Sequence, residues 1–395
     1  MLKKYNVFLT KTNIKTNYFW FAFICAFSVA HIYYNQPILS LISKDLDINP
    51  NKIGIIPFII QISYAFGLIF FVPLGDFLSR KKVLISLLII NSLASFIISF
   101  SQNLIQLIIF NIFIGLTSVG AQIVIPMVSL IAMTHEKGKA VGLVTSGLMT
   151  GVLLGRILSG FIGEIFSWNT VYRFSAILDI LLIFILLRVI PITPISTNFS
   201  YLKTLKSLFS YFFNQKELRY ICLSGGLLFT AVSSLWGALA FLLAHEPYHY
   251  GSDTVGSLGL TGIAGILITP YIGQLVDRLQ PKAVIILASI FCIIGFCLIG
   301  FAQISLIFLI CGLTILDIGA RANLVGNQLK TFNLSTEARS RLNTIFMFCY
   351  FIGGALGTWL GSIISYKYSW LGMAIFGLSL GCVNLVINLA RHIKE

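Results

Sequence analysis

The chain alternates long apolar runs with short polar segments along its whole length. About twelve apolar runs, each of roughly 18 to 28 residues, are long enough to cross a hydrocarbon core about 30 Å thick. They lie at 18–42, 53–74, 83–101, 104–133, 140–166, 170–189, 218–244, 255–276, 283–301, 304–329, 342–366 and 369–389. The pattern predicts an all-α polytopic membrane protein with twelve transmembrane helices, whose ends we place to within ~4 residues.

The longest polar stretch, residues 190–217, lies near the middle of the chain. It begins with Pro191 and Pro194, which disfavour continuation of the preceding helix. We therefore predict an N-terminal six-helix bundle at 1–189, a cytoplasmic linker at 190–217 and a C-terminal six-helix bundle at 218–395.

The composition agrees with a membrane protein. Hydrophobic residues make up 57% of the chain and charged residues 10%, and the mean hydropathy is +0.93. That leaves too little polar surface to cover a water-soluble globule. The net charge of +14 would suit a nucleic-acid-binding protein. However, Lys and Arg concentrate in alternate loops, which predicts an inner-membrane protein with both termini and the linker in the cytoplasm and no nucleic-acid partner.

Chemical motifs for cofactors or catalysis are missing from the sequence. The seven cysteines all fall inside apolar runs, without the spacing of metal sites or disulfides. No Gly-x-x-x-x-Gly-Lys-Ser/Thr loop is present, so ATP is not expected to act directly on this chain. We expect no metal, no cofactor and no enzymatic activity.

The two halves of the sequence carry matching landmarks. Asp76 and Asp277 each follow an apolar run and precede basic residues, and they lie 201 positions apart (277 − 76). Three further pairs repeat at an offset of 201 or 202: Glu136 with Glu337, Trp168 with Trp370, and Gly151 with Gly353. This spacing predicts two parallel repeats related by an axis along the membrane normal.

Several segments carry a family resemblance. They are Gly75-Asp76 with Arg80-Lys81-Lys82, Tyr33 to Pro37 (YYNQP), Gln61 to Gly67 (QISYAFG), Gly151 to Arg156 (GVLLGR) and Glu337 to Asn343 (EARSRLN). With them the chain resembles the major facilitator superfamily, and within it a bacterial branch grouped with the drug:proton antiporters.

The resemblance implies a secondary active transporter that moves a small solute by alternating access, as a proton-coupled exporter. Its expected partners are a small-molecule substrate, protons and membrane lipid, and we expect a monomer. Two alternatives stay open at this point. One is a uniporter or solute importer without proton coupling, and the other is a receptor or scaffold that does not transport.

The resemblance also implies a cytoplasmic gate. In the family, the charged loop after the second helix locks the cytoplasmic side. This implies a gate of Asp76 with Arg80 in the first half and Asp277 with Arg278 in the second. Phe77 stands where the family usually has an Arg. The alternative is a basic loop that only sets topology and contacts anionic lipid.

Ionisable residues at membrane depth are costly and are therefore functional candidates. Asp317 and Arg321 lie at i and i+4 on one helix face. They are a candidate pair for proton coupling, provided that conformational change separates them; the alternative is a static pair. His31 is either a proton carrier or a satisfied interior histidine.

Arg156 and Asp179 lie near mid-depth on consecutive helices. Either they form a structural ion pair, or Arg156 faces the cavity and binds an anionic group of the substrate. Gly147, Gly151 and Gly155 form a face of small residues that favours close helix packing. The fifth helix crosses the interface in the family, so we expect this face to slide against the other half.

In the family, helices 1, 4, 7 and 10 line a central cavity. Polar residues follow the corresponding runs here, with a stripe of Asn111, Gly115, Ser118 and Gln122 in the fourth. Asn111 stands where the family often has an Arg, which leaves the coupling ion open. The candidate cavity residues are Tyr34, Asn35, Gln36, Asn111, Gln122, Arg156 and Trp236. Few of them are charged, which suits a moderately polar or amphipathic solute better than a polyanion.

Overall fold

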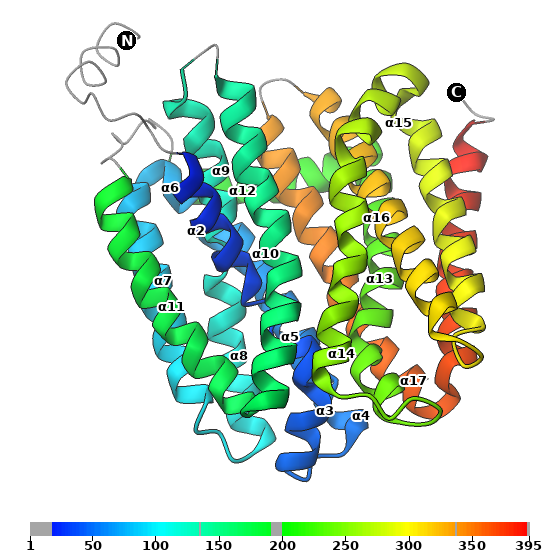
Figure 1. Ribbon diagram of the computed structural model, residues 1–395. Helices are drawn as coiled ribbons and strands as arrows, with labels where there is room; N and C mark the ends of the chain where they lie inside the picture. Colours follow the sequence, from blue (N-terminus) through cyan, green and yellow to red (C-terminus); the bar gives the residue numbers. More distant parts are fainter. Residues whose placement is uncertain (1–17, 134–135, 191–199, 336–337, 393–395) are drawn as a thin grey trace, which may run out of the picture.

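The structure, a computed structural model, describes residues 18–133, 136–190, 200–335 and 338–392. Nearly all of the described chain is helical, and most helices run alongside one another in a single bundle (Figure 1). Many large apolar side chains are exposed on the outside of this bundle, and they suit contact with lipid.

The helix bounds follow the predicted runs closely. The first half contains α2 (Tyr18–Ala30), α3 (Asn35–Asp45), α4 (Pro50–Ile53), α5 (Ile55–Phe70), α6 (Leu74–Phe77), α7 (Arg80–Ile98), α8 (Leu104–Thr117), α9 (Gly120–Ile131), α10 (Lys137–Ile165) and α11 (Trp168–Val189). The second contains α13 (Lys216–Ala244), α14 (Ser252–Ser257), the 3-10 helix η1 (Leu258–Thr261), α15 (Gly262–Gly300), α16 (Leu306–Leu334) and α17 (Arg339–His392). Between them, α12 (Tyr201–Asn214) lies inside the predicted linker.

Within the described residues, 10 helices are long and apolar enough to cross a membrane. The last of these, α17, contains two crossings, because the chain kinks at Ser369. The first predicted crossing is made by α2 and α3 together, each too short to span alone. The all-α membrane fold that the hydrophobic pattern predicts is thereby confirmed.

Some predicted helices are interrupted, among them the first and the fourth. The first run breaks at residues 31–34, three to six positions before Pro37. The ring of Pro37 lacks an N–H and clashes with the carbonyl of the preceding turn. The fourth run breaks at Ser118, whose hydroxyl donates to the Ile114 carbonyl oxygen at 2.6 Å, while Asn91 Nδ2 donates to the same oxygen at 3.2 Å. These side chains share the Ile114 carbonyl with the Ser118 backbone N–H, which lies 3.1 Å from it. The fourth run still forms one membrane-spanning segment, Leu104–Ile131, despite this break.

Glycines bring α10 against α2 and α17 against α13. A Cβ at Gly151 would overlap the Ala26 carbonyl oxygen, and one at Gly357 would overlap the Thr230 carbonyl oxygen. The same backbone-to-backbone contact is therefore made once in each half. The prediction that the glycine face of the fifth helix slides against the other half is wrong. Its partner is α2 in the same half, where Ala22, Ala26 and Ala30 recur every four residues and permit close approach.

The two halves meet tightly at the predicted extracellular end, which is the lower end in Figure 1 with α3, α4 and α14. Ser252 of α14 donates hydrogen bonds from its backbone N–H and its hydroxyl to Glu164 Oε2, at 2.8 Å and 3.0 Å. A Cβ at Gly160 would lie 2.9 Å from Gly256 Cα, and one at Gly54 would overlap the Ser362 hydroxyl. These contacts close this end of the interface.

Candidate functional site

Arg156 of α10 lies between the two halves, just beyond the middle of its helix. Its Nε donates a hydrogen bond to Gln36 Oε1 of α3 at 2.9 Å. Its guanidinium carbon lies 3.7 Å from the centroid of the Trp236 ring on α13 and 5.0 Å from that of Tyr33. The side chain is 8% exposed. An arginine from one half is thus held against an indole of the other half.

Asp317 and Arg321 of α16 form the predicted i,i+4 pair, with Arg321 Nε 2.8 Å from Asp317 Oδ2. The pair lies directly against Gly265 of α15, where any Cβ would overlap both side chains. One turn earlier, a Cβ at Gly262 would lie 3.7 Å from both Asp317 Oδ2 and Leu153 Cδ1 of the other half. The ion pair is therefore located at the seam between the halves.

Arg156 approaches this pair across the seam, because a Cβ at Gly259 would lie 3.5 Å from Arg156 Cβ and one at Gly262 would lie 3.7 Å from Asp317 Oδ2. Two guanidinium groups and one carboxylate leave one positive charge at the site. Among the described residues, no carboxylate lies within ion-pair distance of Arg156. We call Arg156, Asp317, Arg321, Gln36 and Trp236 the central site.

His31 belongs to a different cluster, inside the first half. Its Nε2 lies 2.8 Å from Asp179 Oδ1 on α11, and its Nδ1 lies 2.9 Å from the Ser175 hydroxyl. Both side chains of this pair are almost fully buried. The structural ion pair between Arg156 and Asp179 that the sequence offered as one interpretation is therefore wrong, because Asp179 pairs with His31. The placement fits a satisfied interior histidine, and a role of His31 in proton transfer stays a prediction.

The other predicted cavity residues are dispersed. Tyr34 packs edge-on against the His31 ring, and Asn35 Nδ2 donates to the Ile32 carbonyl at the break of the first helix. Asn111 donates to Leu107 of its own helix at 2.7 Å, and Gly115 one turn later packs against Ile60 of α5. The polar stripe of the fourth run thus faces the interior of its own half at these positions.

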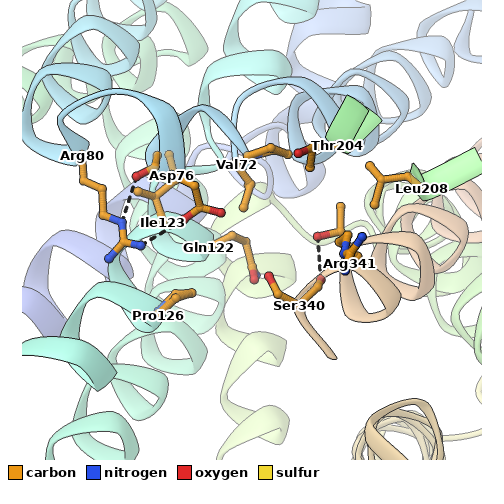
Figure 2. A pocket seen from close by; sticks show the side chains of 13 residues that line it. Val72, Asp76, Arg80, Gln122, Ile123, Pro126, Thr204, Leu208, Ser340 and Arg341 are labelled. Carbon is orange, nitrogen blue, oxygen red and sulfur yellow. Dashed lines mark hydrogen bonds and ion pairs between the residues drawn. The ribbon is translucent and has the colours of Figure 1, made fainter. Parts of the chain in front are cut away.

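Gln122, the last residue of that stripe, lines a recess between the halves at the predicted cytoplasmic end (Figure 2). The recess spans about 480 Å³, a volume that includes open solvent at its mouth. Asp76 and Arg80 lie on one side of it, Ser340 and Arg341 of α17 on the other, and Thr204 and Leu208 of α12 complete the wall.

The predicted gate pair of the first half is formed. Arg80 Nη2 donates to Asp76 Oδ1 and Arg80 Nε donates to the Gly75 carbonyl, both at 3.1 Å. Phe77, at the position where the family usually has Arg, packs its ring edge-on against Tyr201 of α12 at 5.8 Å. Asp277 and Arg278 belong to α15, but their side chains lie outside the described part of the chain. The gating role of both pairs stays a prediction.

The linker helix α12 contacts both halves. Tyr201 Oη donates to the Phe70 carbonyl of α5 at 2.8 Å. Arg341 of α17 donates from Nη1 to the Ser207 hydroxyl at 3.4 Å and lies over the Tyr211 ring at 5.1 Å. Sequence reasoning missed this bridge. It also missed the contact of Tyr33 with Arg156, although Tyr33 belongs to the YYNQP segment that the resemblance singles out.

Comparison with known proteins gives a consistent picture. Residues 19–358 match the family profile of the Major Facilitator Superfamily. The chain is 33% identical over 360 residues to the "Putative uncharacterized transporter YgaY" of Escherichia coli (strain K12), covering 91% of each sequence. It is 27% identical over 384 residues to an "Uncharacterized transporter" of Buchnera aphidicola subsp. Baizongia pistaciae, covering 93% of this chain and 91% of that one.

Solved structures show the same fold at low identity. A bacterial homolog to the human lysosomal transporter Spinster, in an inward-facing and unoccupied conformation, superposes with a TM-score of 0.75 at 15% identity and covers 96% of both chains. The nucleoside transporter NupG gives a TM-score of 0.76 at 14% identity, covering 95% of this chain and 98% of that one.

Proposed function

Because the chain belongs to the major facilitator superfamily of membrane transporters, we propose that it is a proton-coupled secondary transporter in which Asp317 carries the proton. The single observation that carries this proposal is the ion pair of Asp317 with Arg321, located at the seam between the halves. The membrane-embedded transporter and its small-molecule substrate follow from the family itself. Proton coupling and direction are the proposal.

The position of the pair gives a physical route to coupling. Arg321 stabilises the carboxylate of Asp317 while the two stay 2.8 Å apart. Both lie against Gly265 of α15, whose neighbour Gly262 faces Leu153 of the other half. Rocking of the halves changes this packing. When Arg321 is drawn away, an aspartate at membrane depth takes up a proton, and that exchange links protonation to conformation.

The structure supports alternating access as the transport cycle. The contacts of Glu164 with Ser252 and of Gly160 with Gly256 close the predicted extracellular end, and a solvent-open recess lies between the halves at the opposite end. We interpret this arrangement as a state that faces the cytoplasm. The outward-facing state requires these extracellular contacts to separate.

Direction depends on how substrate and proton affect each other at the central site. Export by antiport, which the resemblance to drug:proton antiporters favours, requires that proton and substrate exclude each other. A cationic substrate beside Asp317 meets that requirement. An anionic substrate beside Arg156 does the opposite, because protonation of Asp317 raises the net positive charge and strengthens anion binding. The unpaired Arg156 favours this second candidate, uptake of a solute together with a proton.

Location and assembly complete the proposal. The lysine and arginine distribution supports an inner-membrane protein with both termini in the cytoplasm. We further propose that the monomer is the transporting unit and that lipid surrounds the exposed apolar side chains.

The test uses purified protein in liposomes that enclose a pH-sensitive dye. Anionic, neutral and cationic solutes are supplied in turn, and solute flux and internal pH are recorded together. We expect flux of a carried solute to respond to a pH gradient and Asp317→Asn to remove that response. Asp253→Asn, a carboxylate that binds the Thr254 backbone N–H away from the central site, serves as control. If the flux of a transported solute does not depend on the pH gradient and is the same in Asp317→Asn, the protein is a uniporter. That result would contradict the proposal.

A further inference from the structure

We propose that Arg156 is the binding site for the carboxylate of a small organic monoanion with an aromatic or apolar body. This inference deepens the proposed function, on which it rests, by naming the class of substrate. It begins from the unusual state of Arg156, a charged side chain with 8% exposure that no described carboxylate neutralises. A buried charge without a counter-ion is costly, so a site of this kind favours an anionic ligand.

The donor geometry of Arg156 suits a carboxylate. Among the described residues, its recorded hydrogen bond is the one from Nε to Gln36 Oε1, and this bond fixes the orientation of the guanidinium plane. The Trp236 ring centroid lies 3.7 Å from the guanidinium carbon. The two terminal nitrogens at the edge of the plane then remain to bind both oxygens of a carboxylate side by side.

The charge count selects a monoanion. Asp317 is paired with Arg321, so the central site carries one excess positive charge, which a single carboxylate neutralises. A dication or a simple amine would be repelled, and a dianion would leave a negative charge in the membrane interior. Electrostatics at membrane depth therefore discriminates between solutes by net charge.

The side chains around Arg156 indicate the chemical nature of the rest of the ligand. Trp236 and Tyr33 lie over the guanidinium of Arg156, and Tyr350 of α17 stacks on Phe229 at 3.9 Å. A Cβ at Gly259 would lie 3.5 Å from Arg156 Cβ, and one at Gly262 would lie 3.7 Å from Asp317 Oδ2, so these two positions bring backbone rather than side chains close to the charged groups. The aromatic rings around Arg156 suit an apolar or aromatic body attached to the carboxylate.

Binding can be tested at equilibrium with defined probes. Purified protein is titrated with phenylacetate, and with phenylacetamide, which has a similar shape but no charge. Benzoate and hexanoate extend the series. Because Trp236 lies against Arg156, tryptophan fluorescence reports occupancy, and a Trp236→Phe variant shows which part of the signal comes from this indole. Thermal stabilisation provides a second readout that does not depend on Trp236.

We expect saturable binding of phenylacetate and none of phenylacetamide at the same concentration. Arg156→Gln should weaken phenylacetate binding about tenfold or more, equivalent to ~1.4 kcal/mol, and Arg156→Lys should retain part of the affinity. Arg173→Gln is the matched control, since Arg173 also lies over an aromatic ring, Phe100 at 5.2 Å, but away from the central site. Melting temperatures of the unliganded variants establish that each is folded.

Three outcomes overturn the inference: equal binding of acid and amide, unchanged phenylacetate binding in Arg156→Gln, or no binding of any of the three carboxylates to the wild-type protein. The assay needs no proton gradient. Carboxylate binding at Arg156 could therefore be found even if solute flux is unchanged in Asp317→Asn. That combination would contradict the proposed proton coupling but not the anion-binding site.

Discussion

The guanidinium carbon of Arg156 lies over the indole of Trp236, 3.7 Å from the ring centroid. Arg156 belongs to α10 and Trp236 to α13, so the contact joins the two halves of the chain. It lies on the predicted extracellular side of the bilayer middle, next to the contacts that close that end. The pair therefore stabilises the closed extracellular side as well as the central site.

Trp236→Leu should shift the protein toward the outward-open state. A desolvated cation–π contact contributes ~1–2 kcal/mol, so its loss should raise the open population roughly tenfold. A Ser362→Cys reporter in a variant without native cysteines should then react about tenfold faster with an impermeant maleimide, because Ser362 is buried against Gly54 in the closed state. Trp236→Phe, which keeps an aromatic face, should change labelling much less. Equal labelling in Trp236→Leu and wild type would contradict this role.

Two glycines of α10 should respond differently to alanine. Gly151 packs on α2 within the first half, so Gly151→Ala should destabilise the fold by ~1–3 kcal/mol and lower the melting temperature. Gly160 packs on Gly256 of the other half, so Gly160→Ala should loosen extracellular closure with little change in melting. Melting curves and maleimide labelling at Ser362→Cys measure the two effects. A larger loss of stability in Gly160→Ala than in Gly151→Ala would be inconsistent with the observed packing.

The buried pair of His31 and Asp179 should behave as a structural unit. His31→Leu alone leaves the Asp179 carboxylate buried without its partner, at a cost of ~3–5 kcal/mol. The double variant His31→Leu with Asp179→Leu removes both polar groups and should be more stable than the single one. Thermal unfolding of the three proteins gives the comparison. If His31 carries protons instead, the double variant will be more stable than His31→Leu, but its solute flux will no longer respond to a pH gradient.

Arg341→Ala should release the linker helix α12 from the second half. Arg341 holds Ser207 and lies over the Tyr211 ring, and a partly exposed contact of this kind contributes ~0.5–1 kcal/mol. Amide hydrogen exchange across 201–214 should therefore become a few times faster, without unfolding of the bundle. Arg339→Ala is the control, because Arg339 donates to Phe332 within its own half. Identical exchange rates in Arg341→Ala and wild type would show that α12 is held by other contacts.

Most of the fold can be predicted from the sequence, because a membrane-spanning helix must be apolar over a fixed length. The run at 218–244, for example, corresponds to α13 at Lys216–Ala244. The interruption at residues 31–34 could also have been predicted, since Pro37 cannot donate a backbone hydrogen bond. The break at Ser118 was not predicted, and the contact of Asn91 with the Ile114 carbonyl beside it comes from a neighbouring helix, which the local sequence does not show.

Partners across the bundle were harder to predict than the helices themselves. Arg156 and Asp179 lie at similar depth on consecutive helices, which makes an ion pair reasonable. Depth is fixed by position along the chain, but the direction of a side chain depends on how each helix is rotated about its axis. That rotation directs Asp179 to His31 and Arg156 to Gln36. The prediction for the glycine face was wrong for the same reason. The spacing of small residues indicates that a helix packs closely, but not which helix is its partner.

Two kinds of segment line the cytoplasmic recess: helices of the two matched halves, and the linker helix α12. Asp76 and Arg341 come from the matched halves, whereas Thr204 and Leu208 come from α12, which has no counterpart in the other half. Substitutions in α12 can therefore change the rate at which a solute passes this end while the duplicated helices, and with them the central site, stay the same. In related proteins, selectivity and turnover can thus evolve on separate segments of one chain.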